Sequence, residues 1–218
     1  MLHCGERTEG FFLTTLSAVD VASGWSEFES LWGMGKHRVG AGIEMIRRRL
    51  PFPLRELHTD NGGEFINHVL VPWCAREGIR FTRGRSYRKN DQAYVEQRNW
   101  QGVRREVGYD RYSSRAAHQL LRQLYPLLAL RLNFFRPLRK VVAKERVGSR
   151  VRKRYDAPLT PYQRLLRAGV LGDVRRAAVE RQLSALNPAA LQRQIDTLLR
   201  RLWQLGDQRE QVREQQLG

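Results

Sequence analysis

Two acidic residues on separate elements have the clearest chemical potential in this sequence. Asp60 follows a strand-like stretch and precedes Asn61-Gly62-Gly63, a strong turn signal that ends the strand. Glu96 lies three residues after Ala93 and four before Trp100, within an apolar stripe at helical spacing. A carboxylate on such a stripe is costly unless a cation or another partner compensates its charge.

The two carboxylates suit a divalent metal in a phosphoryl-transfer site. Mg²⁺ (or Mn²⁺) prefers oxygen ligands, and a pair of ions can stabilise both the attacking and the leaving oxygen of an in-line displacement. Each residue also has a simpler interpretation. Asp60 alone is typical of a turn, and Glu96 alone could be a boundary residue whose carboxylate reaches water. Both interpretations stay open from the residues themselves.

The sequences around the two acids resemble a known family. The segments H-T-D-N-G-G-E-F (58–65) and K-N-D-Q-A-Y-V-E-Q-R-N-W (89–100) resemble the catalytic core of bacterial insertion-sequence transposases related to retroviral integrases, the DDE superfamily. Residues 103–112 and 144–163 extend the resemblance to nearly the whole chain. It implies a ribonuclease H-like fold with a five-stranded mixed sheet. It also implies metal-dependent DNA nicking, followed by attack of the freed 3′ hydroxyl on a target strand.

The resemblance implies three catalytic carboxylates, the first of them on a first strand at the centre of the sheet. No acidic residue precedes Glu6, so this sequence does not contain that first carboxylate. We therefore expect an incomplete sheet, in a truncated copy or a chain with a mis-assigned start, and leave open whether it is an enzyme. An in-frame Asp-Thr encoded upstream of Met1 would indicate a wrong start, and a stop codon would indicate a remnant.

Hydrophobic patterns predict an α/β core over residues 1–135. Residues 11–21 and 25–32 favour two strands joined by Ser23-Gly24, and residues 36–50 favour a helix leading to the strand that ends at Asp60. A helix over 66–76 and a strand over 79–82 continue the alternation. Ser113 or Ser114 caps a leucine-rich helix expected to pack over the sheet, which Pro126 should kink or divide.

The chain is strongly basic, which favours a polyanionic partner. It has 39 Lys and Arg against 22 Asp and Glu, a net charge of +17. DNA is the expected partner, although charge alone also fits a ribosome-associated or merely soluble basic protein. A basic loop between the last core strand and the helix of Glu96 is placed to grip phosphates, unless it is simply solvated. The expected contacts there are Arg83, Arg85, Arg88, Lys89 and Gln92.

Beyond the core, residues 136–160 are interpreted as a basic linker that contacts DNA, and residues 161–218 as an all-α basic C-terminal region. The expected DNA contacts in the linker are Arg150, Arg152, Lys153 and Arg154. Thr160-Pro161 and Asn187-Pro188 predict two helix starts. A four-three repeat then indicates a short seam that either forms a homo-oligomer or packs on the preceding helix. Its members are Leu191, Ile195, Leu198, Leu202 and Leu205.

Other site classes receive no support. Cys4 and Cys74 make no disulfide framework, and no histidine spacing resembles a zinc site. No apolar run suggests a membrane span, so a bacterial cytoplasmic location is expected, associated with the nucleoid when bound to DNA.

The leading functional hypothesis is DNA transposition or integration. The alternative is a catalytically inactive remnant that binds DNA or associates with a transposase, and a nuclease of the ribonuclease H kind is weaker.

Overall fold

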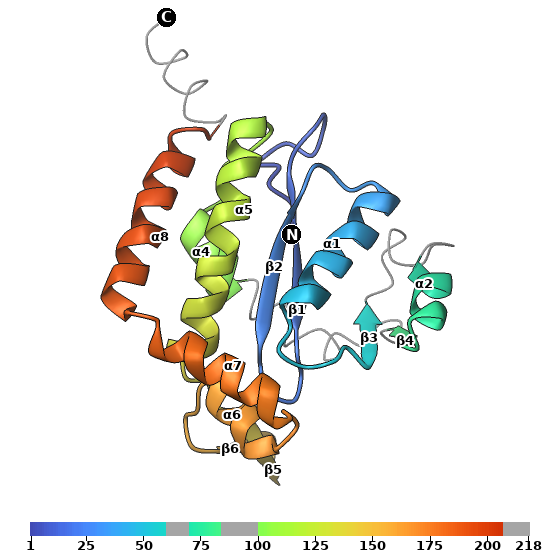
Figure 1. Ribbon diagram of the computed structural model, residues 1–218, viewed down its shortest axis with the longest axis vertical. Coiled ribbons are helices and arrows are strands. Elements are labelled where there is room, and N and C mark those ends of the chain that lie inside the picture. Colours follow the sequence, from blue (N-terminus) through green and yellow to red (C-terminus); the bar gives the residue numbers. More distant parts are fainter. Residues whose placement is uncertain (60–69, 84–99, 207–218) are drawn as a thin grey trace, which may run out of the picture.

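The computed structural model describes residues 1–59, 70–83 and 100–206, a mixed α/β chain (Figure 1). Strands β1 (Thr14–Val19) and β2 (Ser26–Leu31) form the predicted antiparallel hairpin, in a register that runs from Thr14↔Leu31 to Val19↔Ser26. Asp20 closes its turn, because its Oδ2 accepts hydrogen bonds from the Ser23 backbone N–H at 2.7 Å and from Ser23 Oγ at 2.5 Å. This carboxylate therefore has a structural role in the turn.

Strand β2 is buried between two helices, α1 (Lys36–Arg49) and α5 (Arg115–Leu130), as Figure 1 shows. Val39, Ile43 and Ile46 give α1 an apolar face at helical spacing, as the sequence predicts, and pack with Leu16 and Leu31 of the hairpin. The helix approaches closely at one glycine. A Cβ atom at Gly42 would lie 2.7 Å from Leu31 Cδ2, so a larger residue there would push α1 away from the strands.

The second pair of strands is parallel and joined through a helix. Strands β3 (Glu56–Thr59) and β4 (Arg80–Arg83) pair in a register from Glu56↔Arg80 to Thr59↔Arg83, and α2 (Leu70–Arg76) is described between them. The strands of residues 1–59, 70–83 and 100–206 form three separate two-stranded sheets. The single five-stranded sheet implied by the resemblance is therefore not formed by the described strands.

A buried polar cluster connects the first residues to α5. His3 Nε2 lies 2.7 Å from Thr15 Oγ1 and 3.1 Å from the hydroxyl of Tyr125, and the backbone N–H of His3 donates to Leu13 O at 3.0 Å. Burial lowers the pKa of His3 to about 3, so its imidazole is neutral at physiological pH. Residues 1–4 thus lie along the start of β1, where Leu2 bridges to Thr14.

Helix α5 is one continuous helix. Ser114 is its N-cap, accepting a hydrogen bond from the Ala117 N–H, and the helix continues through Pro126 to Leu130. Of the two predicted outcomes at Pro126, a kink or a division, the division is wrong. A π-helical segment, η3 (Arg131–Phe135), follows directly. Its Asn133 side chain accepts from the Ser26 N–H at 2.8 Å and donates to the Ser26 carbonyl at 2.9 Å, which fixes the end of this helix to β2.

The predicted helix of Glu96 lies outside the described residues as far as residue 99. The residues that follow form the π-helical segment η2 (Trp100–Arg104) and the short helix α4 (Arg105–Val107). Val103 and Val107 are fully buried in the main core. Gly102 allows this close packing, because a Cβ atom there would lie 2.8 Å from both Leu132 Cδ1 and Phe28 Cζ.

The C-terminal helices begin at the predicted caps. Thr160 and Gln163 form a capping box at the start of α6 (Pro161–Ala168), and Asn187 caps α8 (Pro188–Trp203). Helix α7 (Asp173–Ser184) lies between them. Among the helices of the described residues, none combines the length and the hydrophobicity that a membrane span requires.

The leucine seam of α8 packs on α5 within the same chain, as the adjacent ribbons in Figure 1 show. The buried residues of α8 share one apolar cluster with Leu121, Leu124 and Leu128 of α5. These residues are Leu191, Ile195, Leu199 and Leu202. Leu198 and Leu205, both in the predicted seam, are partly buried. The seam therefore lies against α5 and not against α7, the helix directly before it, and self-association stays a prediction.

Ile195, which is fully buried, gives a direct test of this packing. Ile195→Val is expected to lower the free energy of unfolding by about 0.5–1.5 kcal/mol, because it removes one buried methylene and leaves a small cavity. Urea unfolding measures the change. Gln194→Ala, on the exposed face of the same helix, should stay within about 0.5 kcal/mol of wild type. A melting temperature that rises with protein concentration would instead indicate an intermolecular seam.

The range 136–160 is not a simple linker. It contains an antiparallel hairpin of β5 (Val141–Val147) and β6 (Arg150–Tyr155), which turns at Gly148 with φ of 61°. Strand β5 contains three valines and β6 one, and valine favours extended backbone, although the density of basic residues obscures that pattern in the sequence. Six of the nine basic residues of this range are therefore held on a two-stranded scaffold.

Candidate nucleic-acid interface

The two predicted metal ligands, Asp60 and Glu96, lie outside the described residues, so their convergence stays a prediction. The same holds for the predicted DNA contacts Arg85, Arg88, Lys89 and Gln92. The strand that leads to Asp60 is described. Thr59 is its last residue, is buried, and has a hydroxyl with no hydrogen-bond partner within the described ranges. A strand whose last residue is buried thus runs to the position directly before Asp60, as predicted.

Arg83 is the predicted DNA contact that the structure places beside this strand end. It is the last residue of β4 and pairs directly with Thr59 in the parallel register. Its side chain is exposed. Because residues paired across a parallel ladder lie side by side, Arg83 lies next to the last residue of the strand that leads to Asp60. Arg83 is therefore positioned to contact an anionic substrate at this end of the strand pair.

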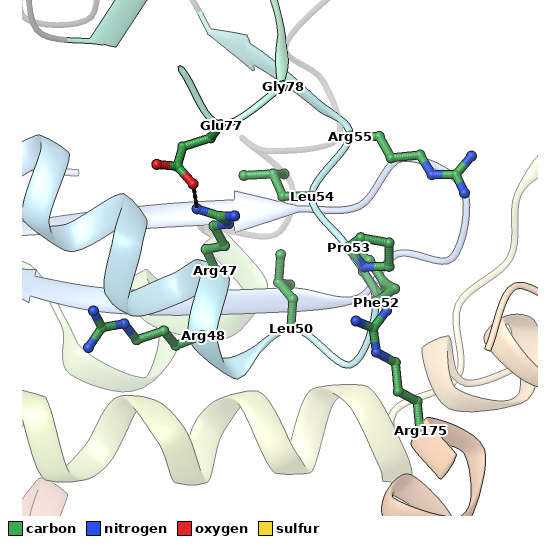
Figure 2. A pocket seen from close by; sticks show the side chains of 10 residues that line it. All are labelled: Arg47, Arg48, Leu50, Phe52, Pro53, Leu54, Arg55, Glu77, Gly78 and Arg175. Carbon is green, nitrogen blue, oxygen red and sulfur yellow. Dashed lines mark hydrogen bonds and ion pairs between the residues drawn. The ribbon is translucent and has the colours of Figure 1, made fainter. Parts of the chain in front are cut away.

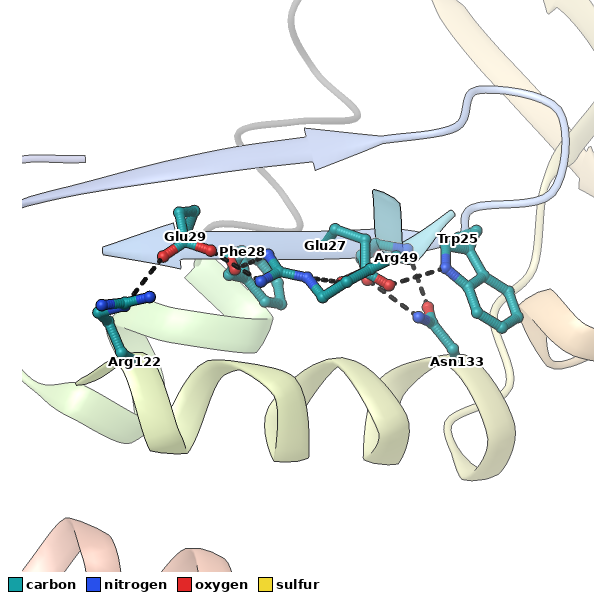
Figure 3. A network of polar contacts seen from close by, with 8 residues as sticks. Trp25, Glu27, Phe28, Glu29, Arg49, Arg122 and Asn133 are labelled. Atoms are coloured by element: carbon teal, nitrogen blue, oxygen red, sulfur yellow. Dashed lines mark hydrogen bonds and ion pairs between the residues drawn. The ribbon is translucent and has the colours of Figure 1, made fainter. Parts of the chain in front are cut away.

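Among the described residues, Glu27 and Glu29 of β2 are buried carboxylates whose charge is compensated by an arginine. Arg49, at the end of α1, places Nε 3.2 Å from Glu27 Oε2 and Nη1 2.7 Å from Glu29 Oε2, while Nη2 donates to the Phe28 carbonyl at 2.7 Å (Figure 3). Trp25 Nε1 also donates to Glu27 at 3.0 Å. We refer to Glu27, Glu29 and Arg49 as the Arg49 clamp.

Burial raises the pKa of Glu27 to about 7, although the hydrogen bonds from Trp25 and Arg49 act in the opposite direction. The two carboxylates of the Arg49 clamp use their oxygens on protein donors, which leaves them poorly suited to bind an ion. Within residues 1–59, 70–83 and 100–206, no cluster of three or more His, Cys, Asp or Glu could hold a metal. The Arg49 clamp therefore joins α1 to β2 and is not a metal site.

The β5–β6 hairpin holds the other predicted DNA contacts. Arg152, Lys153 and Arg154 are exposed on β6, and Arg150 begins the same strand. Cross-strand pairing places Lys144 opposite Lys153, and Arg146 opposite Val151. Lys144 and Arg146 were not among the predicted contacts, although their alternation along a strand could have indicated them. None of the described basic side chains of the two strands forms an ion pair with a described acid.

A polar contact fixes the base of the hairpin to α6. Asp156 Oδ1 accepts from the Lys140 N–H at 2.7 Å, and Arg164 Nη1 lies 2.6 Å from Asp156 Oδ2. These contacts, with Arg164 the larger contributor, lower the pKa of Asp156 to about 2. Arg164 Nη2 also donates to the Leu138 carbonyl at 2.8 Å. The hairpin therefore leaves the body of the protein from a fixed root.

A shallow pocket of about 500 Å³ lies at the opposite end of β3 from Thr59. Its arginines are Arg47, Arg48, Arg55 and Arg175. Arg47 pairs with Glu77 at 2.8 Å, and this contact lowers the pKa of Glu77. Figure 2 shows Arg48 and Arg55 pointing away from one another, and Arg175 lying beside Phe52. The guanidinium groups diverge, so they do not form a site for a single anion.

Comparison with known proteins finds similarity without a matching family. No protein-family model matches the chain. It is similar to "Uncharacterized protein y4rM" of Sinorhizobium fredii (strain NBRC 101917 / NGR234), with 41% identity over 162 residues, which are 74% of this chain and 46% of that protein. The chain thus spans about half the length of this curated relative. Among solved structures, it is similar to the catalytic core domain of BIV integrase. That match has 23% identity and a TM-score of 0.47, and covers 73% of this chain and 93% of the other.

Proposed function

We propose that this chain is an integrase-type core that nicks DNA and transfers strands in a metal-dependent reaction at the ends of a mobile element. The observation that carries the proposal is the parallel β3–β4 pair. Its ends place exposed Arg83 beside Thr59, the residue directly before Asp60 in the H-T-D-N-G-G-E-F segment. A carboxylate at a strand tip next to a cation is a suitable arrangement for holding a phosphate and its counterion.

The donor set fits a hard divalent cation. Asp60 and Glu96 would hold Mg²⁺ (or Mn²⁺), and two carboxylates leave coordination positions open for water and phosphate oxygens. The ion would supply Lewis-acid chemistry, lowering the pKa of a bound water and stabilising the leaving oxygen. Arg83 would bind the phosphate backbone and hold it in position. DNA is the proposed partner, and the resemblance to transposases supports a bacterial cytoplasmic protein that assembles as a homo-oligomer.

A nicking assay tests the reaction. The purified protein is incubated with supercoiled plasmid in Mg²⁺, in Mn²⁺ or in EDTA, and nicked circles are separated from supercoiled DNA by gel electrophoresis. Nicking is expected only with metal, whereas binding measured by fluorescence anisotropy is expected in EDTA as well. Nicking of equal rate in EDTA would contradict the metal-dependent mechanism.

The second candidate is a catalytically inactive protein that binds DNA or associates with a transposase. It is favoured by the β5–β6 hairpin, whose exposed cations require no metal to bind DNA. This candidate predicts salt-sensitive binding with no nicking in either metal. The same assay therefore separates the two candidates. The first predicts nicked plasmid in the presence of Mg²⁺ or Mn²⁺, and the second predicts none.

A further inference from the structure

The β5–β6 hairpin is an exposed, fixed arm. Every described side chain of β6 is exposed, as are most of those of β5, and both strands lie at one end of the molecule beside α6 (Figure 1). Its root is held by Asp156 and Arg164, and also by Lys140, whose Nζ donates to the Val21 carbonyl at 2.5 Å. An arm fixed at its base loses less conformational freedom on binding than a free tail does.

The strand register divides the charges of the arm between two faces. Residues directly opposite one another in an antiparallel pair project to the same side, and so do alternate residues along each strand. One side, called the Lys144 face, has three cations and no acid: it carries Lys144, Arg146, Lys153 and Val151. The other side pairs Glu145 with Arg152, Ala143 with Arg154 and Val147 with Arg150, so it combines three arginine positions with one acid.

The positive charges of the Lys144 face repel one another in the unbound protein. Lys144 lies directly opposite Lys153, and like charges in that position destabilise a pair of strands. The single acid of the two strands, Glu145, projects from the other side. None of the three cations forms an ion pair with an acid in the described ranges. A polyanion would remove this repulsion, so the face is complementary to a row of phosphates.

We propose that the β5–β6 arm enters the major groove of duplex DNA with the Lys144 face toward the DNA. This inference rests on the proposed DNA partner and specifies the form of DNA and the mode of contact. The major groove is about 12 Å wide and admits a two-stranded β-ribbon. The seven residues of β5 span roughly 20 Å. Val151, which is 56% exposed on this face, provides an apolar contact of the kind that thymine methyl groups accept.

Three double variants, each removing two positive charges, test the proposal. Lys144→Gln with Lys153→Gln changes the Lys144 face, Arg152→Gln with Arg154→Gln changes the opposite face, and Arg193→Gln with Arg201→Gln changes exposed positions of α8. Affinities for a 20-base-pair duplex and for one of its strands are measured by fluorescence anisotropy in EDTA, over a range of salt concentrations. Circular dichroism and thermal melting establish that each variant is folded.

The Lys144-face variant is expected to lose duplex affinity on the order of tenfold to a hundredfold at about 0.1 M salt, and its salt slope should fall by about 2, because each phosphate contact contributes about 0.9. The opposite-face variant should lose less, and the α8 variant should match wild type. Wild type should prefer duplex over single strand and protect guanine N7 from methylation, since that atom lies in the major groove. The Lys144-face variant should lose this protection.

Three results would overturn the inference: equal losses from the two faces of the arm, a preference for single-stranded DNA, or unprotected guanine N7. Equal losses would indicate diffuse attraction, and the other two results would exclude the major groove of a duplex. All of these measurements are made without metal. If nicking is absent but the Lys144-face variant loses duplex affinity and guanine protection as expected, the proposed catalytic function fails and this inference stands. If nicking occurs but these binding results are not obtained, this inference fails and the proposed function stands.

Discussion

Glu96→Gln is expected to reduce metal-dependent nicking and strand transfer by on the order of a thousandfold, while DNA binding in EDTA stays unchanged. The amide keeps the size of the side chain but lacks the negative charge that a hard cation prefers. A metal acting as a Lewis acid provides several kcal/mol of transition-state stabilisation, and about 1.4 kcal/mol corresponds to each tenfold in rate. Asp60→Asn should behave in the same way, because the proposal assigns both carboxylates to the same ions.

Rates of nicking and strand transfer on labelled duplexes measure this loss, beside anisotropy in EDTA for binding. Glu9→Gln is the matched control, since it makes the same chemical change at an exposed residue outside both sequence segments. It should transfer strands at the rate of the parent chain. Unchanged transfer by Glu96→Gln would refute the role of Glu96, and lost binding would indicate that the substitution disrupts the fold.

Arg49→Met is expected to lower the free energy of unfolding by about 3–5 kcal/mol. The substitution removes the cation of the Arg49 clamp, which leaves Glu27 with its hydrogen bond from Trp25 and Glu29 with Arg122 at 3.8 Å. Breaking a buried ion pair on one side costs about this much. Glu27 and Glu29 have side chains that are 7% and 8% exposed, so water cannot easily compensate them. A loss of this size is a large share of the roughly 5–15 kcal/mol that stabilises a typical domain.

Arg48→Met provides the matched control for this prediction. Arg48 is the neighbouring residue of the same helix, but its side chain is 70% exposed and pairs with Glu44 on the surface. Its substitution should cost less than about 1 kcal/mol in urea unfolding. If both variants lose the same stability, the Arg49 clamp does not hold α1 against β2.

The loss in Arg49→Met should also depend on pH. Burial raises the pKa of Glu27 to about 7, above its value of 4.5 in the unfolded chain, so the folded state binds this proton more tightly. That contribution favours folding fully below pH 4.5 and is lost as the pH rises to 7. Removing the compensating cation strengthens the dependence, so the difference from wild type should be smaller at pH 5 than at pH 8.

Local signals predict much of this fold correctly. The hairpin of residues 11–32, helix α1, the Ser114 cap and the caps at Thr160 and Asn187 all follow from short-range periodicity and capping chemistry. The β5–β6 hairpin differs from the predicted linker because basic residues dominate the sequence pattern there, although Gly148 marks a turn between two valine-containing stretches. The pairing of β5 with β6 depends on the register of both whole strands, so no single residue in the sequence indicates it.

Partner choice over long distances could not be predicted. Arg47, Arg48 and Arg49 look equivalent in the sequence, and only the angle at which α1 packs on β2 directs the last of them to two glutamates. The position of Arg83 beside Thr59 likewise depends on a parallel register that the sequence does not specify. The convergence of Asp60 and Glu96 is a relation of the same long-range kind, and it stays a prediction.

The packing of α8 on α5 limits how copies of this chain could associate through the leucine seam. Those leucines are already buried within one chain, so they are unavailable to a second copy unless α8 leaves its own α5. Assembly through the seam would therefore be a domain swap, with the three residues between α7 and α8, 185–187, acting as the hinge. The swapped and unswapped forms would share nearly every contact. A shorter hinge would shift the balance toward the exchanged dimer.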